Sequence, residues 1–308
     1  MSLLVVGSMA FDALETPFGK TDKIVGGAAT YISLSASYFV KPVNVVSVVG
    51  GDFDQDHIGL MHTREISTEG VQMKENEKSF FWSGRYFNDM NSRETLVTEL
   101  NVLGDFDPVI PESYQGCEYL MLGNLAPQVQ RTVLERLTKR PKLIVMDTMN
   151  FWMDIALDEL KQTIALVDVL SINDEEARQL SGDYSLVKAA KKIMAMGPKF
   201  LIIKKGEHGA LLFHEDKVFF APALPLEEVF DPTGAGDTFA GGFIGYIAST
   251  GDTSFENMKR AIIHGSALAS FCVEKFGTER LINLSQEEID SRVQQFVNLV
   301  AFNAELPQ

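Results

Sequence analysis

The residues best suited to chemistry form one run, Asp-Pro-Thr-Gly-Ala-Gly-Asp, at positions 231–237. Gly234, Ala235 and Gly236 are small enough for backbone N–H groups to close around an anion. An apolar spacing typical of a helix follows, so the turn offers unpaired N–H donors and the positive end of a helix dipole. Asp237 would repel a bound phosphate, but it suits a base beside a phosphoryl group in transfer.

Two commoner nucleotide motifs do not match this run. A dinucleotide fingerprint needs glycine where Phe239 stands, and a Walker A loop needs Gly-Lys-Ser/Thr, which occurs nowhere in the chain. An ordinary helix start explains Asp237 alone. It does not explain three consecutive small residues between two aspartates, with Gly241–Gly242 downstream. The run therefore predicts an anion site.

At these residues the chain resembles the ribokinase/PfkB family of carbohydrate and nucleoside kinases, whose signature reads Asp-Thr-x-Gly-Ala-Gly-Asp. Here Pro232 takes the second position and Thr233 follows. The resemblance extends over nearly the whole chain. It implies a single ribokinase-like α/β domain over residues 1–308, in three α/β/α layers with a mostly parallel central sheet and a small β-sheet lid. It also implies that Asp237 is the catalytic base and that the Gly-Ala-Gly run forms the anion hole.

The elements that must position this loop are visible as alternating patterns. Apolar runs predict buried strands at 3–7, 43–49, 119–122, 143–146, 167–172 and 200–204. Helical patterns occur at 28–39, 129–137, 155–165, 175–180 and 185–196, with further helices near 255–274 and 285–301. Such alternation predicts a mostly parallel sheet with helices on both faces. Binding sites in such sheets lie at the carboxyl ends of the strands.

Residues 77–103 break the alternation, because they are rich in Phe, Tyr, Thr and Val and lack a helical period. They predict strands of a small separate sheet, joined by residues near 12–24. A hairpin packed on the main domain is the alternative. The resemblance implies a lid over the substrate, through which a homodimer is expected to form.

The acceptor side of the site is expected near the N-terminus. Asp12 follows the first strand, where a carboxylate can accept hydrogen bonds from the hydroxyls of a sugar. Gly26 and Gly27 precede a helix and allow a ligand to approach the backbone closely. A solvated turn and a tightly packed helix start are the respective alternatives. The resemblance implies that all three residues bind substrate, with the glycines at the hinge of the lid.

A magnesium site is expected at Asn173 and Glu176. Their i, i+3 spacing at the start of a helix puts an amide and a carboxylate on one face. Ordinary compensation of the helix dipole explains acidic residues there equally well. The resemblance implies that the pair holds Mg²⁺ through water, which suits a cation that keeps much of its hydration.

The nucleotide is expected at several further positions. Lys204 and Lys205 precede a turn with Gly206 and Gly209, which the resemblance places against the phosphates of ATP. Two lysines in an acidic protein would supply positive charge there, although solvated lysines are the alternative. By the same resemblance, the nucleotide site includes Asn173, Thr233, Gly234, Gly236 and His264. Asp231 and Thr233 would hold a monovalent cation such as K⁺, as in relatives, and Asp147 and Asn150 are expected near phosphates or substrate.

Composition limits the partners. The 308 residues include 27 Lys and Arg against 42 Asp and Glu, a net charge of −15. Such acidity argues against nucleic-acid and anionic-membrane partners. No apolar run is long enough to span a membrane, the N-terminus lacks a basic leader, and Cys117 and Cys272 are too few for a disulfide framework. A cytoplasmic protein is therefore expected.

These features predict an ATP- and Mg²⁺-dependent kinase that phosphorylates a hydroxyl, expected to be primary, of a sugar or sugar derivative. The alternative is a nucleoside kinase, because lid aromatics would stack on a nucleobase. These aromatics are Phe80, Phe81, Trp82, Tyr86 and Phe87. Ranked below are a sugar-phosphate kinase, for which the lid region supplies Lys20, Lys23, Arg85 and Arg93, and a catalytically inactive ligand sensor.

Overall fold

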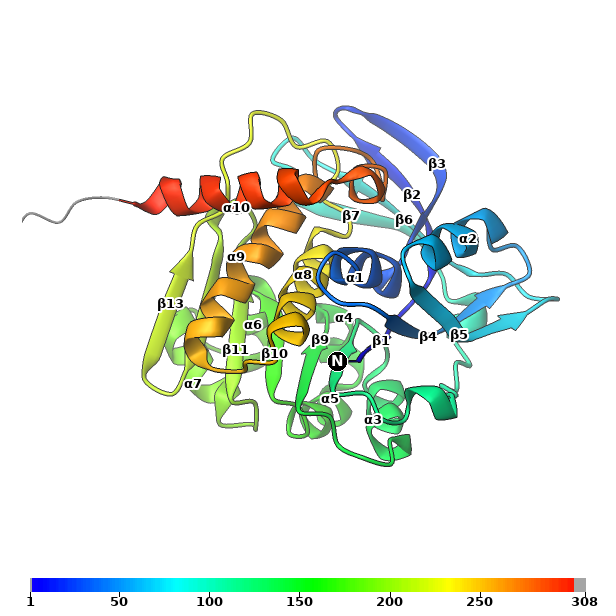
Figure 1. Ribbon diagram of the computed structural model, residues 1–308, viewed down its shortest axis with the longest axis horizontal. Coiled ribbons are helices and arrows are strands. Elements are labelled where there is room, and N and C mark those ends of the chain that lie inside the picture. The colour runs from blue at the N-terminus through cyan, green and yellow to red at the C-terminus, as the bar shows by residue number, and fades with distance from the viewer. Residues whose placement is uncertain (1, 302–308) are drawn as a thin grey trace, which may run out of the picture.

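A large central sheet with helices on both faces dominates the computed structural model, which describes residues 2–301 (Figure 1). The sheet has the strand order β13-β12-β11-β10-β9-β8-β1-β4-β5. All neighbours from β11 to β5 run parallel, whereas β12 and β13 are antiparallel. The strands are β1 Leu3–Val6, β4 Val43–Gly50, β5 Ile66–Lys74, β8 Tyr119–Leu122, β9 Leu143–Asp147, β10 Val169–Asn173, β11 Phe200–Lys204, β12 Ala210–His214 and β13 Lys217–Ala221.

The central strands are apolar throughout because both faces are covered. Leu3 and Val5 pack into one core and Leu4 and Val6 into the other, since successive residues of a strand face opposite sides. The first core takes α1 Ala28–Ala36, α2 Gln55–Thr63, α8 Ala235–Thr250 and α9 Phe255–Cys272. The second takes α3 Pro127–Arg136, α4 Asn150–Ile155, α5 Leu157–Ile164, α6 Asp174–Ser181 and α7 Leu186–Met194. Helix α10, Gln286–Val300, packs on α9.

A second sheet of four strands stands apart from the main one, in the order β3-β2-β6-β7 (Figure 1). It consists of β2 Ala10–Thr16, β3 Gly19–Gly26, β6 Phe80–Tyr86 and β7 Arg93–Glu99. Two segments distant in sequence therefore form one small sheet, as the composition of residues 77–103 predicts.

The predicted α/β architecture is confirmed, and each predicted strand and helix is present with ends that differ by a few residues. Among the α-helices and β-strands of residues 2–301, α2, α4, β5, β12 and β13 were not predicted. Within residues 2–301, no helix combines the length and apolar character that crossing a membrane requires.

Candidate active site

The Gly-Ala-Gly run forms the turn into α8. Helix α8 begins at Ala235, and its N-cap Gly234 has a left-handed φ of 73°. A Cβ on Gly234 would lie 2.5 Å from the ring of Tyr31 in α1. Two independent constraints therefore require glycine at this position: the left-handed backbone angle and the closely packed Tyr31 ring. The first turn of α8 leaves its N–H groups at the carboxyl edge of the sheet, as an anion site needs.

Asp231 fixes the beginning of the same loop. Its side chain is fully buried, Oδ1 accepts a hydrogen bond from the Thr233 N–H at 2.8 Å, and Oδ2 accepts one from the Gly277 N–H at 2.9 Å. Burial raises the pKa of this carboxyl, and the hydrogen bonds from Gly277 and Thr233 oppose the rise. Asp231 thus ties the loop to the segment after α9, while its role toward K⁺ stays a prediction.

Asp237 lies in the first turn of α8, partly buried. Burial, and then the charge of Asp147, raise its pKa to about 7, while Lys204 and Arg93 oppose the rise. A carboxylate whose pKa lies near neutrality is well matched to accept a proton at that pH. The position and the pKa both fit a general base.

Lys204 brings a positive charge to this loop. Its Nζ lies 2.6 Å from Oδ2 of Asp147 and would lie 3.3 Å from a Cβ on Gly236. Burial disfavours the charged form, but Asp147 and Glu176 outweigh it, so the pKa of the ammonium is raised. Lys205, in contrast, is held through its backbone N–H, which donates to the Gly209 carbonyl at 2.8 Å.

Asp147, the last residue of β9, and Asn150, the first residue of α4, were both expected near phosphates or substrate. Asp147 contacts Lys204, whereas the Asn150 side chain donates to Gln179 Oε1 at 2.5 Å. The structure therefore separates two residues that sequence proximity grouped together.

Asn173 and Glu176 form a capping box at the start of α6. The Glu176 N–H donates to Asn173 Oδ1 at 2.8 Å, and the Asn173 N–H donates to Glu176 Oε2 at 2.7 Å. Burial, and then the charge of Asp147, raise the pKa of Glu176 to about 7. Glu176 commits one oxygen to the cap, so the second suits water bound to Mg²⁺, which prefers oxygen ligands. Within residues 2–301, no cluster of three or more His, Cys, Asp or Glu side chains is arranged to hold a metal ion.

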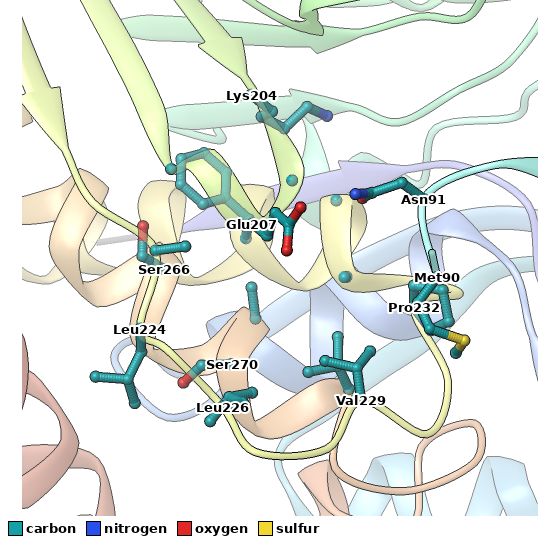
Figure 2. Close-up of a pocket in the computed structure, with 18 of the residues that line it drawn as sticks. Met90, Asn91, Lys204, Glu207, Leu224, Leu226, Val229, Pro232, Ser266 and Ser270 are labelled. Atoms are coloured by element: carbon teal, nitrogen blue, oxygen red, sulfur yellow. The ribbon is translucent and has the colours of Figure 1, made fainter. Parts of the chain in front are cut away.

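A cavity of about 460 Å³ opens beside the loop (Figure 2). Lys204 and Asn91 lie at one end, and Leu224 and Leu226 lie at the other. This volume is within the roughly 300–1,000 Å³ typical of small-molecule sites. The polar end borders Ala235 and Gly236, and the other end is mostly apolar, an arrangement that suits a nucleotide. Its walls include Gly206, Gly209, Ala223, Val229, Ala235, Gly236, Phe239, Ser266, Ala269, Ser270 and Val273.

Two residues expected at the nucleotide lie outside the wall of this cavity. His264 does not line the cavity, because its ring stacks on Tyr246 with centroids 4.0 Å apart and its Nδ1 lies 2.9 Å from the Arg260 carbonyl. Ser266 and Ser270, on another face of α9, line it instead. Lys205 is likewise absent from the cavity wall, which leaves Lys204 as the lysine of the site.

Asp12 lies close enough to Asp231 and Asp237 for their charges to act on its carboxyl group. It is 5% exposed, and burial, followed by the charges of Asp231 and Asp237, raises its pKa to about 8. A Cβ on Gly26 would overlap the Asp12 carboxylate, so the first glycine leaves room for this side chain. Gly27, with φ of 94°, is the N-cap of α1. The structure thus brings Asp12, both glycines and Asp237 together.

One face of the small sheet is turned toward the loop. Asp12 pairs with Trp82 across β2 and β6, and Tyr86 pairs with Arg93 across β6 and β7. Paired residues and residues two apart share a face, so all four side chains lie on the same side. The Tyr86 hydroxyl lies 3.2 Å from the hydroxyl of Thr233, which places that side against the loop.

Sequence reasoning missed Tyr31 and did not single out Arg93. Tyr31 looks like an ordinary core position of α1, and its hydroxyl is buried without a hydrogen-bond partner among the described residues. Arg93 is one of several basic residues of its segment, and only its pairing with Tyr86 reveals which way it faces. The loop at 223–229 carries no motif at all.

The fold and the site together define a kinase of the ribokinase-like fold. The family model described as pfkB family carbohydrate kinase matches residues 2–283. The chain therefore belongs to the pfkB family of carbohydrate kinases.

Relatives and solved structures agree with this assignment. A cytidine kinase of Thermococcus kodakarensis is 30% identical over 250 residues, which cover 79% of this chain and 87% of the relative. A nucleoside kinase of Methanothermobacter thermautotrophicus is 25% identical over 306 residues, 90% of this chain and 91% of the relative. The structure of a ribokinase II from Escherichia coli, in complex with ATP and Mg²⁺, has a TM-score of 0.79 at 19% identity and covers 96% of this chain and 99% of that one.

Proposed function

We propose that this chain transfers the γ-phosphoryl group of ATP to the primary hydroxyl of a ribose carried by a nucleoside. The observation that carries the transfer is the position of Asp237. It lies in the first turn of α8, next to Gly236 of the cavity wall, and close enough to the buried Asp12 for its charge to raise the pKa of Asp12. A base in that position can take the proton of an acceptor hydroxyl as the hydroxyl attacks phosphorus.

Each part of the site has a role in the proposed reaction. Asp12 orients the acceptor through its hydroxyls, and Asp237 accepts the proton. The backbone N–H groups of Gly234 and Gly236 stabilise the charge on the transferring group, together with Lys204, whereas the Ala235 N–H donates to the Pro232 carbonyl at 3.2 Å. Asn173 and Glu176 would hold Mg²⁺ through water, and the bound ion would neutralise charge on the phosphates. A monovalent cation held by Asp231 and Thr233 is part of the same proposal.

The small sheet is proposed to act as a lid that excludes water. Its hairpin turn already contributes Asp89, Met90 and Asn91 to the cavity wall. A Cβ on Gly206 would lie 2.6 Å from Oδ1 of Asn91, so the turn touches the glycine turn after β11. Closure of this kind suppresses transfer of the phosphoryl group to water.

Trp82 favours a nucleoside over a free sugar. It pairs with Asp12 on the face turned toward the loop, is partly exposed, and donates from Nε1 to Thr95 Oγ1 at 3.3 Å. A Cβ on Gly84 would overlap this ring, so the absence of a side chain there lets the indole lie along the strand. An aromatic face beside the residue that binds ribose hydroxyls suits a base. The similarity to a cytidine kinase supports the same choice.

A free sugar is the second candidate, since Asp12 would bind sugar hydroxyls whether or not a base is attached. A sugar phosphate fits less well. Asp12 and Asp237 lie close enough for the charge of Asp237 to raise the pKa of Asp12, and Asp231 does the same. A phosphorylated acceptor would add negative charge to these carboxylates.

ADP release from the purified protein with Mg-ATP tests the proposal, with cytidine, inosine and adenosine compared with ribose, fructose and their phosphates. Asp237→Asn serves as the blank. We expect turnover with at least one nucleoside, and a Trp82→Ala variant whose KM for that nucleoside rises while its KM for ATP does not. Turnover with free sugars alone would contradict the nucleoside assignment, and ATP binding without turnover on any acceptor would contradict the proposed kinase reaction.

A further inference from the structure

A buried ion pair bridges the carboxyl ends of two strands beside the anion hole. Asp147 ends β9 and Lys204 ends β11, with β10 between them. Oδ2 of Asp147 and Nζ of Lys204 are 2.6 Å apart, and the side chains are 9% and 18% exposed. Because both side chains are this little exposed, the contact differs from a surface ion pair, which contributes little to stability.

Besides Asp147, two other carboxylates lie near the ammonium of Lys204. Glu176 and Asp237 both act on its charge from α6 and α8. A lysine side chain is a flexible stem with a compact charge at its tip, so the strongest partner decides where the charge rests. Asp147 is that partner, and the ammonium consequently lies against the backbone of Gly236.

We propose that Asp147 is a positioning residue. It holds the ammonium of Lys204 near Gly236, where the ammonium meets the transferring phosphoryl group instead of pairing with the base Asp237. The inference rests on the proposed phosphoryl transfer, and it gives a role to an aspartate that makes no contact of its own with a reacting atom.

Asp168 offers a matched control at the opposite edge of the same sheet. Its carboxylate is also buried, at 8% exposure, and is paired with Lys199 at 3.3 Å and Arg140 at 3.1 Å. It precedes β10, so it lies at the amino ends of the strands, away from the anion hole. Asp168→Asn therefore removes the charge of a comparably buried carboxylate, whose partners Lys199 and Arg140 are 71% and 55% exposed, without touching the site.

The test compares Asp147→Asn, Asp168→Asn, Lys204→Met and the double variant Asp147→Asn/Lys204→Met, with steady-state kinetics and the melting temperature of each. For Asp147→Asn we expect kcat to fall about tenfold or more, the loss expected when a charge-assisted contact is misplaced, with KM for ATP nearly unchanged. Asp168→Asn should keep kcat even if it melts earlier. In the Lys204→Met background, Asp147→Asn should cause no further loss of kcat, because Asp147 acts through Lys204.

Three results would overturn the inference. An unchanged kcat in Asp147→Asn, with tighter ATP binding, would mean that Asp147 merely repels phosphates. A further fall of kcat in the double variant would mean that it acts independently of Lys204. An equal loss in Asp168→Asn would mean that kcat follows stability. If Lys204→Met does not fold, the nearly isosteric Asp147→Asn still tests the inference. In that variant kcat should fall while KM for ATP stays nearly unchanged. An inactive wild-type protein would instead count against the proposed function.

Discussion

The hydroxyl of Tyr86, on the small sheet, lies 3.2 Å from the hydroxyl of Thr233, on the loop that leads into α8. Tyr86 is also directly paired with Arg93 across β6 and β7. This contact joins the small sheet to the loop at the point where phosphoryl transfer is proposed. It also brings the positive charge of Arg93 close enough to oppose the raised pKa values of Asp237 and Glu176.

Replacement of Arg93 should impair turnover. We expect Arg93→Ala to lower kcat roughly tenfold, the cost of one charge-assisted contact, and to move the acidic limb of the pH–rate profile to higher pH. The shift follows because the loss of a nearby cation raises the pKa of Asp237.

Arg85→Ala is the matched control for Arg93. Arg85 is the neighbour of Tyr86 on β6, so it faces the other side of the sheet, where it pairs with Glu15 at 3.2 Å and Glu94 at 3.7 Å. Kinetics over a range of pH should show little change in Arg85→Ala. Equal effects of the two substitutions would show that lid charge in general, and not the position of Arg93, matters.

The activity should rise with pH through neutrality. Asp237 must be ionised to accept a proton, and its pKa is about 7, so kcat/KM should fall as the pH drops below that value. Glu176 has a similar pKa of about 7, so the acidic limb of the profile of kcat/KM against pH reports the coupled titration of both carboxylates. Measurement of kcat/KM from about pH 5 to 9 checks this expectation, and a profile flat through neutrality would contradict it.

Removal of the Asp12 charge should stabilise the ligand-free protein, most of all at alkaline pH. The folded-state pKa of about 8 lies above the value of about 3.9 expected in the unfolded chain. Between these values the folded state binds more protons than the unfolded state, so the free energy of unfolding falls as pH rises. The destabilisation is absent below the unfolded pKa and complete only above the folded pKa.

Thermal melts of wild type and Asp12→Asn should therefore differ more at about pH 8 than at about pH 5, with the variant more stable. Asp52→Asn is the contrasting control, because hydrogen bonds to its carboxylate from Ser79 and Lys23 outweigh burial and lower its pKa. A gain in Asp12→Asn that did not depend on pH would argue against a strongly raised pKa.

The sequence predicted those parts of the fold that depend on local pattern. Continuous apolar strands such as 119–122 are recognisable because both faces of the sheet are covered, and the loop at 231–237 because an anion hole needs small residues. Strands β12 and β13 were missed because the polar residues at 214–217 interrupt the apolar pattern of residues 210–221.

The rest of the site depends on contacts between distant segments. Nothing in the residues around Asp147 indicates that Lys204 will pair with it, 57 positions away. His264 was expected at the nucleotide because its helix lies there, but a helix has several faces and its ring packs on Tyr246. Arg93 acquires its orientation only from the register of β6 and β7.

The role of Asp237 as the base is the central claim, and single-turnover and steady-state kinetics of Asp237→Asn test it most directly. The substitution keeps size and hydrogen bonding but cannot accept the proton. We expect kcat to fall by about 10²–10⁴-fold while the affinity for ATP, measured by calorimetry, stays close to that of wild type. Near-normal turnover in Asp237→Asn would show that another group takes the proton and would contradict the account.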